Sequence, residues 1–171
     1  MRKLVLLYLL LLAHFAQSQN DLPKLDSVKM LMTTMAIQME LATGVNEMYN
    51  NNFTVAESQF NWLKSNYPQH PMPHFLLGLC NWWKMMPNTD KTTYDFIFLA
   101  YMDSTVHYAE VMYKADKENV EAAFFLSAAH AFKARLFAER KKWRKAATEG
   151  KRSLKYLEIC HGKDYLSPEL L

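Results

Sequence analysis

The sequence predicts an all-α protein made of tandem antiparallel helical hairpins, with about six helices. Hydrophobic residues make up 50% of the 171 positions, and the abundant Met, Leu, Ala, Lys and Glu lose little side-chain freedom in a helix. Gly occurs only 4 times, and residues 88–149 contain neither Gly nor Pro, a stretch too long for a protein of strands and turns. The breaks between the expected helices are short, so successive helices should pack antiparallel.

Residues 1–18 are expected to form a signal peptide. Arg2 and Lys3 make a short basic head, an apolar run of about 12 residues follows, and residues 16–18 (Ala-Gln-Ser) provide a cleavage site between small residues. The run is shorter than the roughly 20 residues that a membrane-spanning helix needs. We therefore expect a mature helical domain of residues 19–171, exported to the periplasm or secreted, with no later transmembrane span. An uncleaved membrane anchor is the alternative.

Capping residues, prolines and turns delimit the expected helices. Asp and Ser at 26–27 can cap the first helix, and Pro68 ends the second. Pro71 and Pro73 fall in the first turn of the third helix, where proline is tolerated. Residues 167–169 (Ser-Pro-Glu) have the pattern of another helix start, so the domain could continue past this sequence. The expected helices cover about 28–49, 55–66, 71–86, 93–114, 120–140 and 143–159.

Glycine recurs after 34 residues in the first part of the chain, and small, aromatic and proline residues follow the first glycine at regular distances. Gly44 and Gly78 are separated by that interval. Ala56 follows Gly44 after twelve residues, Phe60 comes four residues later and Pro68 eight later still. This pattern resembles the tetratricopeptide-repeat family, whose hairpins stack into a solenoid. The matching signature positions are Gly44, Ala56, Phe60, Pro68, Leu77 and Gly78.

Each signature residue has a structural role that the resemblance implies. Gly44 and Ala56 should face each other across the first hairpin, and Gly78 should make the equivalent close contact in the second. Phe60 should fill the space between neighbouring hairpins. Pro68 should turn the chain into the next unit.

The resemblance is specific over about a third of the chain. Glu47 stands where the family usually has Tyr, and Thr43 replaces the Leu that precedes the first signature glycine. After Gly78 the strict period fails, and the later helices are expected to reach about 20 residues instead of 11 or 12. The remainder of the chain is similar to the family in outline.

A stripe of large apolar side chains on the expected third helix is the best functional hint. Its members recur at i, i+4 and i+7, so they share one helix face. The resemblance implies that this face lines a concave groove, where aromatic side chains would anchor a protein or peptide partner. Packing in the core is the alternative, which the sequence leaves open. The candidate groove residues are Phe75, Leu79, Trp82, Trp83, Phe125 and Phe132.

Basic residues are concentrated near the end of the chain. Residues 133–155 contain ten Lys or Arg against Glu139 and Glu149, a net charge of +8. We interpret this segment as the solvated outer face of two helices, since export argues against a nucleic-acid partner. Contact with an acidic partner or with an anionic membrane surface remains an open alternative.

The sequence offers no catalytic, cofactor-binding or metal-binding candidates. His70 and His74 have the spacing of a metal pair, but the intervening prolines remove His70 from the helix that would align them.

Export permits a disulfide between Cys80 and Cys160, although the apolar surroundings of Cys80 favour a core cysteine. Residues 52–54 (Asn-Phe-Thr) form a glycosylation acceptor in an expected turn.

These features predict an extracytoplasmic helical-repeat scaffold that binds a protein or peptide, and not an enzyme. The alternative is a helical domain of an enzyme or enzyme subunit that supports a small-molecule site.

Overall fold

The computed structural model describes residues 31–161, and every regular element in this part of the chain is a helix. The all-α prediction and the expected antiparallel packing of successive helices are confirmed. The expected signal peptide, the cap at 26–27 and the helix start at 167–169 lie outside the described residues. A short 3-10 turn, η2 (Leu31–Thr33), precedes six helices: α2 (Met35–Tyr49), α3 (Phe53–Asn66), α4 (Pro71–Met85), α5 (Asp95–Ala115), α6 (Val120–Glu139) and α7 (Trp143–His161).

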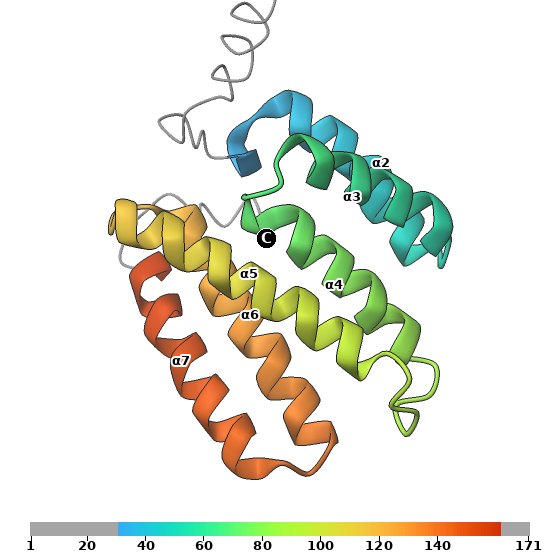
Figure 1. The fold of residues 1–171 in the computed structure, drawn as a ribbon, viewed down its shortest axis with the longest axis vertical. Coiled ribbons are helices and arrows are strands. Elements are labelled where there is room, and N and C mark those ends of the chain that lie inside the picture. Colours follow the sequence, from blue (N-terminus) through green and yellow to red (C-terminus); the bar gives the residue numbers. More distant parts are fainter. Residues whose placement is uncertain (1–30, 162–171) are drawn as a thin grey trace, which may run out of the picture.

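The helices form three consecutive hairpins, α2 with α3, α4 with α5, and α6 with α7 (Figure 1). Neighbouring hairpins meet through α3 against α4 and through α5 against α6. α4 and α6 also contact each other, so α4 lies enclosed in the middle of the molecule. Among the described residues, α2 and α7 stand at the two ends of the array, and each packs mainly on its hairpin partner (Figure 1).

Local chemistry explains where the central helices begin. Pro71 and Pro73 occupy the first turn of α4, as predicted, and Nδ1 of His70 accepts a hydrogen bond from the backbone N–H of Met72. Asn119 caps α6 by accepting a hydrogen bond of 2.8 Å from the backbone N–H of Ala122. These caps satisfy N–H groups that have no partner inside the helix.

The first two helices differ from their predicted bounds. α2 begins at Met35, seven residues later than expected, and η2 stands before it. α3 begins at Phe53, two residues earlier than expected. The turn before α3 is tight because Asn51 adopts a left-handed backbone with φ 65°, a conformation that Asn tolerates.

Glycine allows close helix contact in the first two hairpins. A Cβ atom at Gly44 would lie 2.7 Å from Cε1 of Phe60 and 2.7 Å from Oε1 of Gln59 on α3. A Cβ atom at Gly78 would overlap Cε of Met102 on α5, as the second-hairpin prediction requires. The close approach at Gly44 is therefore confirmed, but its nearest neighbours are Phe60 and Gln59 and not the predicted Ala56. The bulky Phe60 ring reaches across the hairpin and occupies that space.

The other signature residues mostly enter the core. Ala56, Phe60 and Leu77 are buried. Pro68 follows the end of α3 by two residues and remains exposed, consistent with its predicted role in ending the helix. One core cluster runs from α2 to α6, with Tyr156 of α7 packed against it, and a smaller cluster of Val120, Ala123 and Cys160 joins α6 to α7.

Candidate functional site

The six predicted groove residues lie in the core or pack against it, and Trp83 meets Tyr49 of α2 edge to face. Phe75, Trp82 and Phe125 are buried, whereas Leu79, Trp83 and Phe132 are half-buried. The expectation that Trp82 faces a groove is therefore wrong: its side chain is only 8% exposed.

Ring contacts account for this burial. Trp82 packs on Phe98 of α5 at 5.6 Å between ring centroids and on Phe132 of α6 at 5.4 Å. Phe75 meets Phe125 and Phe132 edge to face. Helices α5 and α6 both cover the aromatic face of α4, so the stripe is a packing layer.

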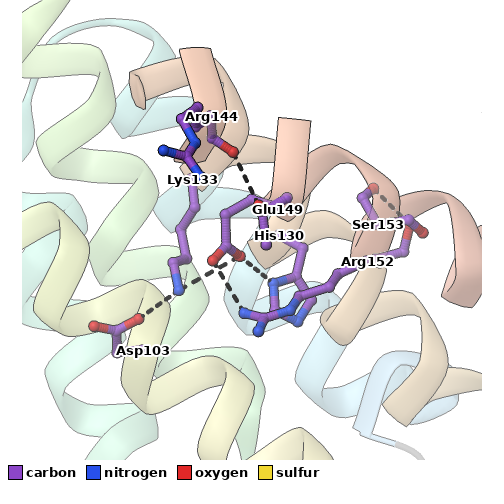
Figure 2. A network of polar contacts seen from close by, with 9 residues as sticks. Asp103, His130, Lys133, Arg144, Glu149, Arg152 and Ser153 are labelled. Atoms are coloured by element: carbon purple, nitrogen blue, oxygen red, sulfur yellow. Dashed lines mark hydrogen bonds and ion pairs between the residues drawn. The ribbon is translucent and has the colours of Figure 1, made fainter. Parts of the chain in front are cut away.

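A polar network joins α5, α6 and α7, with the carboxylate of Glu149 at its centre (Figure 2). One oxygen of Glu149 lies 2.6 Å from Nδ1 of His130 and 3.6 Å from Nζ of Lys133. The other oxygen accepts a hydrogen bond of 3.1 Å from Arg152. Nζ of Lys133 also pairs with Asp103 of α5 at 2.7 Å. The network thus ties three helices together through one buried carboxylate.

The contacts of this network indicate a structural role, which is to hold the three helices together. His130, Lys133 and Glu149 are buried, while Asp103 and Arg152 reach the solvent. Burial lowers the pKa of His130, and its hydrogen bond to Glu149 opposes that shift. The His130 ring also stacks on Tyr156 with planes 6° apart. An enclosed imidazole whose neighbours are all engaged has little access to a substrate.

A second buried polar contact lies where α4 and α6 begin. Oε1 of Glu121 accepts a hydrogen bond of 3.1 Å from the backbone N–H of Met32 and lies 3.5 Å from Nε2 of His70. The Glu121 side chain is only 1% exposed. Glu121 therefore holds the η2 turn against the body of the protein.

Burial keeps His70 uncharged near neutral pH and favours the protonated form of Glu121. Burial raises the pKa of Glu121 to about 7 and lowers that of His70 to about 4. An ion pair would move both pKa values in the opposite directions. Because Nδ1 of His70 accepts the Met72 N–H, the neutral ring carries its proton on Nε2, facing Glu121.

Neither cysteine has the character of a nucleophile. Cys80 and Cys160 are both buried and unpaired, so the structure contains no disulfide between them. Burial raises the pKa of the Cys80 thiol to about 12 and also raises that of Cys160. A thiol that stays protonated reacts slowly.

Among residues 31–161, no three His, Cys, Asp or Glu side chains gather closely enough to hold a metal ion. His70 and His74 make different contacts. The first caps α4, while Nε2 of the second lies 3.0 Å from the carbonyl oxygen of Pro68.

An exposed apolar stripe runs along α7, and the sequence analysis missed it. We call it the α7 stripe. Trp143, Leu154 and Leu157 are 64%, 60% and 51% exposed. The basic residues around them drew attention to charge, although the alternating spacing of four and three residues was already present in the sequence. The α7 stripe consists of Trp143, Ala147, Gly150, Leu154 and Leu157.

A shallow groove is also present between α2 and α3. The half-exposed Trp62 lines this groove, and Gln59 contributes a polar group to it. Its full lining is Glu40, Leu41, Ser58, Gln59, Trp62 and Leu63. Asn52, the predicted glycosylation acceptor, is exposed in the α2–α3 turn, as expected.

Comparison with protein-family models, curated proteins and solved structures finds no significant match to this chain. The tetratricopeptide resemblance therefore rests on the residues of the chain itself. Within the described part, no helix combines the length and apolar character needed to cross a membrane.

Proposed function

We propose that this chain is an extracytoplasmic scaffold of tetratricopeptide-like hairpins that binds a protein or peptide partner. The observation that carries the proposal is the α7 stripe, which lies on the last hairpin. Three of its side chains are more than half exposed. Contiguous exposed apolar side chains on a helix usually mark an interaction surface.

The way the hairpins pack supports this reading. Each hairpin is closed by a tight contact between its two helices: Gly44 with Phe60, Gly78 with Met102, and Ser127 with Ser153. The second hairpin is covered on both sides, by α3 and by α6. On the third hairpin, the outward side of α7 has no such cover among the described residues. In a stacked array, that is the side on which the next helical unit would pack.

The buried polar groups do not favour the enzyme alternative. The His130–Glu149 pair is enclosed and ties helices together, and both cysteines are buried as thiols. Part of the positive charge of residues 133–155 is neutralised within the protein, because four of its side chains pair with carboxylates: Lys133, Arg135, Arg140 and Arg152. A nucleic-acid interface would need those charges free.

Photo-cross-linking in the cells that produce the protein tests this function. A photoactivatable residue in place of Leu154 should form a discrete adduct with another protein. The same residue in place of Phe96, which is 85% exposed on α5, provides a matched control and should form none. The N-terminus of the cross-linked protein, read by mass spectrometry, should begin at or beside Gln19. Folded protein that forms no protein adduct at position 154 would refute the proposal.

A further inference from the structure

Gly150 is placed differently from the other helical glycines of the described chain. Gly44 and Gly78 face a neighbouring helix so closely that a Cβ atom would collide with it. A Cβ atom at Gly150 would meet nothing within 4 Å. Gly in a helix interior is unfavourable relative to Ala, so its presence calls for a local reason. At Gly44 and Gly78 that reason is a packed helix, whereas no described residue packs against Gly150.

The neighbours of Gly150 form the seam that such a helix would need. Trp143, Ala147, Gly150, Leu154 and Leu157 follow spacings of four, three, four and three residues. This is the spacing of a coiled-coil seam, in which side chains of one helix fit between those of another. Ala147 and Gly150 leave a shallow place at the centre, between the larger Trp143 and Leu154. A helix crossing there could approach closely.

Positive charge borders this seam. Arg144, Lys151 and Lys155 are exposed, and the last two follow Gly150 and Leu154 directly along the chain. No ion pair joins these three side chains to a carboxylate in the described part of the protein. Glu158 is the one acidic residue on the same border. Complementarity therefore calls for a partner with carboxylates beside its apolar face.

Two other occupants fit these observations less well. A second copy of α7 would bring lysines and arginines against one another. A lipid surface favours a broad face of bulky apolar side chains, but the centre of this stripe is narrow and small.

We infer that α7 binds an acidic amphipathic helix of a partner protein, which crosses the α7 stripe at Gly150. This inference rests on the proposed scaffold function and adds the chemistry of the partner. The apolar side of the bound helix packs between Trp143 and Leu157. Its carboxylates face Lys151, Lys155 and Arg144.

The test uses two synthetic, dye-labelled helical peptides of about three heptads with the same Leu and Ala seam. One carries Glu beside the seam, and the other carries Lys at those positions. Fluorescence anisotropy with the full chain should show that the Glu peptide binds at least about tenfold more tightly. Added salt should weaken its binding. Phosphatidylglycerol and phosphatidylcholine vesicles are tested in parallel by co-sedimentation, and light scattering gives the mass of the free protein.

Variants of α7 locate the site. Gly150→Leu should weaken binding of the Glu peptide by about tenfold or more, because the new side chain blocks the crossing point. The protein should remain folded, since that side chain points into open space. Lys151→Glu with Lys155→Glu should weaken it to a similar degree. Phe96→Ser, and Lys64→Glu with Lys91→Glu, are the controls outside α7 and should leave it unchanged.

Several results would overturn the inference. They are equal binding of both peptides, binding of neither, binding of phosphatidylglycerol vesicles in place of the Glu peptide, and a dimer that Gly150→Leu abolishes. The proposed function has its own readout. Cross-linking from position 154 to a protein segment that is not an acidic helix would leave the scaffold function standing and overturn only this inference.

Discussion

The same residue type serves opposite purposes at Gly44 and Gly150. At Gly44 a methyl group would press on the ring of Phe60, which is fully buried and cannot retreat. Gly44→Ala should therefore lower the free energy of unfolding by about 1–3 kcal/mol. Gly150→Ala should raise it by about 0.5–1 kcal/mol, because Ala is the better helix former and the site is open. Urea denaturation followed by circular dichroism measures both changes, and effects of the same sign would contradict this assignment.

Glu121 should make stability depend on pH. Its folded pKa of about 7 exceeds the ordinary value of 4.5, so its contribution is complete below pH 4.5 and is lost as pH rises through 7. Glu121→Gln keeps an acceptor for the Met32 N–H and never ionises. The variant should gain stability relative to the wild type at pH 8 and differ little at pH 5.

His70 makes stability depend on pH in the direction opposite to Glu121, so the two residues must be considered together. Its pKa of about 4 lies below the ordinary 6.5, so its contribution is present above pH 6.5 and is lost as pH falls through 4. His70 is present in both proteins, so comparing wild type with Glu121→Gln largely removes its effect. Glu158→Gln, on exposed α7, is the matched control and should show no difference between the two pH values. A Glu121→Gln effect that is equal at pH 5 and pH 8 would show that Glu121 is not the titrating group.

At the scale of helices, Glu149 is the buried carboxylate through which α6 and α7 share a polar network. Glu149→Ala would leave His130 and Lys133 buried without this carboxylate, although Lys133 keeps Asp103. We expect a loss of about 3 kcal/mol in the free energy of unfolding, since breaking a buried polar cluster leaves uncompensated groups. The His130→Ala and Glu149→Ala double-mutant cycle should give a coupling of about 1–3 kcal/mol by urea denaturation. Additive effects would mean that the two residues act independently.

The bounds of the helices were predictable where local signals set them. Pro71, Pro73 and Asn119 mark the starts of α4 and α6 in the sequence itself. The start of α2 was not predictable, because the η2 turn before it is held by Glu121, 89 residues away along the chain. A contact of that kind leaves no periodic or capping signal.

At the candidate site, the sequence predicts which side chains share a helix face, but it does not predict whether another helix covers that face. Spacing in the sequence identified Phe75 and Trp82 as sharing a face, and they do, but it did not reveal that α5 and α6 cover that face. The α7 stripe has equally regular spacing, but no other described helix covers it. Periodicity tells which side chains lie together, whereas exposure depends on how whole helices stack.

At the scale of the whole molecule, burial is distributed unevenly among the hairpins. α4 buries twelve of its 15 residues, whereas α2 buries three of 15. α2 reaches the rest of the protein mainly through α3, and its Met35 and Met39 are largely exposed. Stability in a stacked array is a sum of unit and neighbour terms, so an end unit with few buried side chains should open alone.

Hydrogen exchange measured by mass spectrometry should therefore rank the helices. Amides of α2 should exchange fastest, those of α3 next, and those of α4 and α6 slowest, because opening α4 requires separation of α3, α5 and α6. Gly44→Ala should speed exchange in α2 and α3 while leaving α6 nearly unchanged, since the side chains nearest to Gly44 belong to α3. Gly78→Leu is the matched comparison. Its side chain would collide with Met102 in the enclosed hairpin, so this variant should speed exchange in every helix. Equal protection of α2 and α4, or a uniform response to Gly44→Ala, would mean that the three hairpins unfold as a single cooperative unit.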